Sequence, residues 1–170
     1  MDYLARKFQR AKWDIHQFMN QDDIQADAIG GCLRTSSNNL SFWCCHKTEE
    51  DIKEVALAIA ADYDTLQKMH LIIFKYTDIT DQGFQFEHVP GRTPIQELRD
   101  RHLDLVHLTV DNLAAFAHFM KVRVRNDIDC HFFTRDEVRT MLSQAIVSGR
   151  LQIDDLHEKM RPNFCQDQLN

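Results

Sequence analysis

Hydrophobic residues along this chain switch repeatedly between helical and strand spacing, and this switching constrains the fold most. Residues 135–149 carry apolar residues at helical spacing after a capping box, in which Thr134 precedes Glu137 by three positions. Residues 70–76 are instead almost continuously apolar, which is typical of a strand covered on both faces. Helices and strands mixed in this way predict an α+β or mixed α/β fold.

The same rules predict the other elements. Helices are expected over residues 4–19 (short and amphipathic), 24–33, 49–59, 94–108, 110–120 and 153–160. Strands are expected over residues 40–46, over 83–89 as the hairpin partner of 70–76, and over 121–132. The prediction is therefore one compact domain over residues 1–170, with about four strands including a hairpin, several packing helices and a frayed polar end from Gln166.

Length and composition favour a globular chain outside the membrane. The 170 residues are enough for one core, and 44% of them are hydrophobic. The longest purely apolar run, residues 55–61, falls far short of the ~20 residues that span a bilayer, and no secretory signal is visible. Five cysteines without a CxxC spacing indicate reduced thiols, so we expect a cytoplasmic location.

The net charge of −6 disfavours a protein built to bind a nucleic-acid backbone. A local contact with phosphates remains compatible with this charge. It would be made by Lys121, Arg123 and Arg125, which alternate along a predicted strand. A solvated edge strand explains these three residues equally well.

Asp127, Asp129 and His131 form the best local cluster for chemistry. On an extended backbone, alternate side chains share one face, so the three are expected to lie together. Carboxylates can orient a histidine that acts as a general base, which makes these residues candidate catalytic residues. The competing interpretation is a solvated strand face.

Arg34, Thr35 and Ser36 form a second candidate, a ligand-binding turn. An arginine with hydroxyls beside a turn can hold a phosphate through charge-assisted hydrogen bonds. No glycine-rich phosphate loop accompanies them, and turn hydroxyls often serve the backbone instead.

Two other patterns give weaker evidence for a functional site. His102 and His107 flank Asp104, but a separation of five residues prevents them from converging in a helix or a strand, so no metal site is predicted. Cys44 and Cys45 point to opposite faces of a predicted strand, which favours burial over catalysis.

The leading hypothesis is thus a small interaction or regulatory protein that binds, and could neutralise, a protein partner or that self-associates. Its candidate surfaces are the acidic residues 49–54 and the aromatic pair Phe84 and Phe86. The alternative is an enzyme acting on a nucleotide or phosphoester through Asp127, Asp129 and His131. The sequence identifies no cofactor and does not decide between an enzyme and a binding protein.

Overall fold

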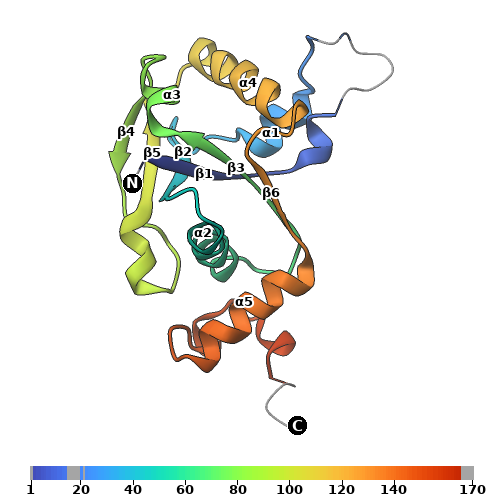
Figure 1. The fold of residues 1–170 in the computed structure, drawn as a ribbon, viewed down its shortest axis with the longest axis vertical. Helices are drawn as coiled ribbons and strands as arrows, with labels where there is room; N and C mark the ends of the chain where they lie inside the picture. The colour runs from blue at the N-terminus through green and yellow to red at the C-terminus, as the bar shows by residue number, and fades with distance from the viewer. Residues whose placement is uncertain (1, 15–19, 21, 166–170) are drawn as a thin grey trace.

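A single six-stranded antiparallel sheet organises the computed structural model, which describes residues 2–14, 20 and 22–165 (Figure 1). The strands lie in the order β4-β5-β2-β1-β3-β6. Their bounds are β1 Tyr3–Phe8, β2 Leu40–Cys45, β3 Met69–Lys75, β4 Gln85–His88, β5 His102–Val106 and β6 Cys130–Phe133. The helices are α1 Ala26–Cys32, α2 Glu49–Ala61, α3 Tyr76–Thr80, α4 Val110–Arg125 and α5 Arg135–Val147. Short 3-10 helices span Arg10–Lys12, Gln96–Arg101, Ile153–Asp155 and Arg161–Asn163.

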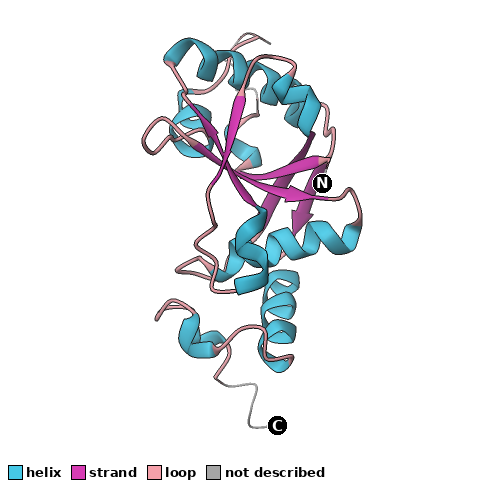
Figure 2. Cartoon of the chain, turned by 90° about the vertical axis from the view of Figure 1, so that its left-hand side faces the viewer, coloured by secondary structure: helices cyan, strands magenta, loops and turns pink. Residues whose placement is uncertain are grey.

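Helices cover both faces of this sheet, α2 and α5 on one side and α1 and α4 on the other (Figures 1 and 2). Side chains along β3 alternate between the two covered faces. Leu71 and Ile73 pack in the cluster beneath α2, whereas Ile72 and Phe74 pack in the cluster beneath α4. All four are fully buried, which confirms the doubly covered strand and a compact α+β fold.

Local helix signals predicted several elements correctly. The Thr134 hydroxyl accepts a hydrogen bond from the Glu137 backbone N–H, and the Glu137 carboxylate accepts one from the Thr134 N–H at 2.7 Å. Thr109 and Asn112 form the same reciprocal pair at the start of α4, whereas at α2 the Thr48 hydroxyl accepts a hydrogen bond from the Asp51 N–H without a reciprocal bond. Gly149 follows α5 with φ of 76°, a left-handed conformation that ends the helix.

The N-terminal segment is a correction. A helix was expected over residues 4–19, but residues 3–8 form β1, paired with β2 on one side and β3 on the other. Residues 15–19 lie outside the described residues. Leu4 and Phe8 are four residues apart, a spacing that places side chains together in both a helix and a strand. Pairing with two distant strands decides the outcome, and sequence spacing does not report it.

Five further predictions were wrong. Residues 94–108 hold a short 3-10 helix and then β5, not one helix. Residues 121–125 end helix α4 rather than beginning a strand. The expected hairpin is absent, because β4 pairs with β5 while β3 pairs with β1 and β6. The sheet therefore has six strands, not about four. The final predicted helix, residues 153–160, is reduced to one 3-10 turn at Ile153–Asp155, and the tail from Gln166 lies outside the described residues.

Candidate functional site

A cavity of about 500 Å³ lies between the sheet and the C-terminal end of α2. Its floor is made by Ser41 and Trp43 of β2 and by His102 and Asp104 of β5. Three segments supply the walls: the turn at residues 36–39, the end of α2 at residues 59–63 and the loop after β4 at residues 89–92. This size falls within the ordinary range of small-molecule sites.

Antiparallel pairing of β2 with β5 creates the floor. Ser41 lies directly opposite Asp104, and Trp43 lies directly opposite His102. Because side chains alternate along a strand, all four project from the face that α2 covers, while Phe42 and Leu105 point into the other core. The register of one strand pair thus brings a hydroxyl, a carboxylate, an imidazole and an indole together.

The imidazole of His102 is held in one orientation. Its Nδ1 lies 2.7 Å from the Val89 carbonyl oxygen, which can only accept, so Nδ1 carries the proton. Its Nε2 then faces Asp104 Oδ1 at 3.8 Å, and the Trp43 ring meets the imidazole edge-on at 5.1 Å between centroids. Ser41 Oγ donates to the same Asp104 oxygen at 3.5 Å. The carboxylate therefore lies between a hydroxyl and an imidazole.

The loop after β4 approaches this floor very closely at Gly91. A Cβ atom on Gly91 would lie 2.5 Å from Trp43 Cη2 and 3.1 Å from His102 Cβ. The Gly91 N–H donates to the Arg99 carbonyl oxygen at 2.9 Å, which fixes the loop in place. Only glycine fits this position without displacing the indole.

Ionisable groups at the α2 end have shifted pKa values. Partial burial in the cavity wall raises the pKa of Asp62, and Arg92 opposes this shift. Burial also raises the pKa of Tyr63. Lys7 lies with Nζ 3.7 Å from the Tyr63 ring centre, and its burial lowers its pKa to about 8. Such a concentration of shifted groups beside a cavity is a physical sign of a functional site.

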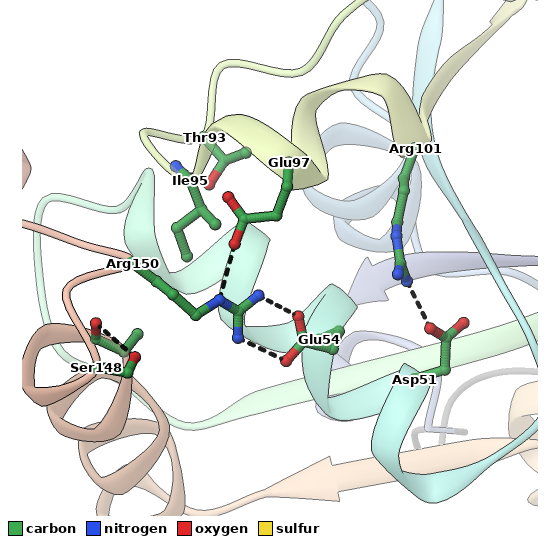
Figure 3. Close-up of polar contacts among 9 residues, drawn as sticks. Asp51, Glu54, Thr93, Ile95, Glu97, Arg101, Ser148 and Arg150 are labelled. Atoms are coloured by element: carbon green, nitrogen blue, oxygen red, sulfur yellow. Dashed lines mark hydrogen bonds and ion pairs between the residues drawn. The ribbon is translucent and has the colours of Figure 1, made fainter.

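Ion pairs hold the loop-bearing segment against α2 (Figure 3). Arg150, just after α5, donates to both carboxylate oxygens of Glu54 on α2 at 3.0 and 2.6 Å, and to Glu97 at 2.7 Å. Arg101 donates to Asp51, at the start of α2, at 2.5 Å. Because Glu97 and Arg101 belong to the 3-10 helix that follows the cavity loop, these contacts position one wall of the cavity.

The predicted cluster of Asp127, Asp129 and His131 lies elsewhere. Asp127 and Asp129 do not sit on an extended strand, because both adopt positive φ values of 56° and 54° in the turn after α4. Asp127 pairs with Arg10, whereas Asp129 pairs with Lys47 at 2.5 Å and with Arg123 at 3.6 Å. The left-handed turn breaks the alternation on which the prediction depended.

His131 lies on β6 and lines a separate hollow that Lys47 also lines. Across the residues that the structure describes, no three His, Cys, Asp or Glu side chains are placed to hold a metal ion. A catalytic role for Asp127, Asp129 and His131 remains a prediction.

The structure separates the residues of the second predicted site, Arg34, Thr35 and Ser36. Ser36 lines the cavity, and its backbone pairs with Asn39 in a tight turn. Arg34 and Thr35 do not line the cavity. His102 and Asp104 were missed because a helix was expected there. The alternation of Leu103 and Leu105 was the signal that places His102 and Asp104 together on the opposite face.

Comparison with known proteins adds no further assignment. No family model, curated protein or solved structure matches this chain. Within the described residues, no helix has the length and apolar character to cross a bilayer. The geometry of the cavity therefore carries the functional argument.

Proposed function

We propose that this protein binds a nucleoside-like ligand, a flat ring joined to a sugar, in the cavity above Trp43. The observation that carries the proposal is the convergence of two carboxylates, several hydroxyls and two aromatic side chains on one space of about 500 Å³. Carboxylates are acceptors and match the adjacent hydroxyls of a sugar. The rings of Trp43 and Tyr63 offer apolar surface to a flat heterocycle.

The charges favour a nucleoside over a nucleotide. Asp62 and Asp104 both line the cavity, and Arg92 is its one guanidinium among the described residues. A chain of phosphates would meet two carboxylates, and like charges repel each other. We therefore favour a neutral ligand over the phosphoester that the sequence suggested.

Isothermal titration calorimetry of the full chain with adenosine, uridine and ATP tests this proposal. We expect the nucleosides to bind and ATP to bind at least tenfold more weakly. Ser41→Leu fills the cavity floor and should abolish nucleoside binding. Ser143→Leu, the same change on α5 away from the cavity, should leave it unchanged. Absence of nucleoside binding, or equal losses in both variants, contradicts the proposal.

We propose self-association through the β6 edge as a second function, in keeping with the interaction hypothesis. The β4 edge carries the exposed polar residues Gln85, Glu87 and His88, which discourage pairing, whereas β6 reads Cys-His-Phe-Phe and exposes half of Phe132. Lys47, Lys53, Glu49 and Glu137 line the hollow beside Phe132. An exposed strand edge of this kind suits a second copy, because two β6 strands related by a two-fold axis can pair antiparallel.

The surfaces suggested by the sequence support an interface less well. Phe84 is buried in the core, and Glu49, Asp51 and Glu54 are already paired with cations of the same chain.

Free thiols on all five cysteines support a cytoplasmic location, which we also propose.

Light scattering coupled to size exclusion tests the association. A dimer that Phe132→Asp dissociates, and that Val147→Asp on the exposed face of α5 does not, supports the β6 edge. A monomer at every concentration, or dissociation by both variants, refutes it.

A further inference from the structure

Two carboxylates reach the cavity from different elements. Asp104 projects from the sheet floor, whereas Asp62 caps the C-terminal end of α2. Two acidic groups in unlike surroundings on either side of one ligand are the arrangement by which proteins hydrolyse glycosidic bonds. Their surroundings differ here, which suggests different tasks for the two groups.

Asp104 is built as a proton acceptor. Its side chain is 17% exposed and that of His102 is 11% exposed, so both lie largely out of water. Because Nδ1 of His102 donates to Val89, the free Nε2 lone pair faces the carboxylate at 3.8 Å. Asp104 and His102 can thus hold one extra proton between them, with Ser41 donating to the carboxylate from the other side.

Asp62 is placed as a proton donor. Among the described residues, none donates a hydrogen bond to its carboxylate, and partial burial raises its pKa. It also caps a helix C-terminus, where the helix dipole disfavours negative charge. Asp62 thus lies on the cavity wall where its acid form can give a proton to a departing group.

We propose that the cavity hydrolyses the glycosidic bond of its ligand, an inference that rests on the proposed nucleoside site. A water molecule attacks the anomeric carbon and gives its proton to Asp104 and His102. The bond from that carbon to the leaving heterocycle breaks, and the leaving atom takes the proton of Asp62. The products are the free sugar and the free base, and proton exchange with solvent restores both groups.

Chromatographic detection of the free base tests the inference. The full chain is incubated with adenosine, inosine and uridine, and in parallel with 4-nitrophenyl glycosides, in which an O-glycosidic bond to nitrophenol replaces the N-glycosidic bond to a nucleobase. We expect turnover of a nucleoside, and Asp62→Asn or Asp104→Asn to lower kcat/KM by at least 100-fold. Asp62→Asn should also remove the alkaline limb of the pH profile, which loss of structure alone would not do. Asp100→Asn, an exposed carboxylate outside the cavity, should retain full activity.

The outcomes separate the inference from the binding proposal. Nucleosides that bind by calorimetry but are not cleaved overturn the hydrolysis and leave the binding site intact. Nucleosides that neither bind nor react overturn both. Turnover of 4-nitrophenyl glycosides alone would overturn the nucleoside as the substrate but would keep the catalytic roles of Asp62 and Asp104. Turnover that persists in both variants would show that neither Asp62 nor Asp104 takes part in the reaction.

Discussion

Replacing Gly91 with alanine should destabilise the protein by about 2 kcal/mol. The added Cβ would lie 2.5 Å from Trp43 Cη2, against 3.4 Å for an ordinary contact, so one of the two groups must move by about 0.9 Å. Overpacking a well-filled site in this way costs about 1–3 kcal/mol. For a domain of this length, the midpoint of thermal unfolding should fall by roughly 4–8 °C.

Gly30→Ala supplies the matched control for this substitution. Gly30 lies within α1, and nothing approaches its added Cβ within 4 Å. Alanine in a helix interior is favoured over glycine, so this variant should gain about 0.5–1 kcal/mol. Urea unfolding measures both changes, and the near-ultraviolet circular dichroism of Trp43 should change only in Gly91→Ala. Equal stability changes in the two variants would refute the close approach of the loop to the indole.

Three further predictions test other contacts. Arg150→Gln should cost about 1–2 kcal/mol in urea unfolding, because a bidentate pair with Glu54 and a bond to Glu97 are lost; a loss below 0.5 kcal/mol, on the order of one exposed pair, would contradict the network. Lys7 has a pKa of about 8 in the folded chain against 10.5 ordinarily, so the folded state loses its proton first. Stability of the native chain relative to Lys7→Met should therefore rise between pH 8 and 10.5, by about 1–2 kcal/mol after allowance for partial exposure, and a flat difference would contradict the burial. Thr134→Ala should cost about 1 kcal/mol through loss of the α5 cap, whereas the mid-helix change Thr140→Ala should cost less.

The fold was predictable where the signal is local. A capping box needs only residues that are three apart, so Thr134 and Glu137 predicted the start of α5. β5 was not predictable in this way, because its strand character depends on pairing with β2, more than 60 residues away along the chain, as in Ser41 opposite Asp104. Short apolar runs fit either structure until such a partner is known.

The candidate site was likewise predictable only where the sequence signal is local. The turn that contains Ser36 was predicted from local residues, whereas a binding role for Ser36 remains a prediction. His102 and Asp104 lie two residues apart and were weighed as part of a helix, in which they would not share a face. The cavity itself needs α2, β2, β5 and the Gly91 loop together, and no single segment of the sequence contains that arrangement.

The indole N–H resonances of the two tryptophans test the central claim most directly. Trp43 lines the cavity, whereas Trp13 is buried in the core on the other face of the sheet and serves as an internal reference. In a ¹H–¹⁵N correlation spectrum of the full chain titrated with adenosine, we predict that the Trp43 resonance shifts with saturation while the Trp13 resonance stays in place. A Trp43 resonance that does not move, or equal shifts of both, would contradict a ligand site in this cavity.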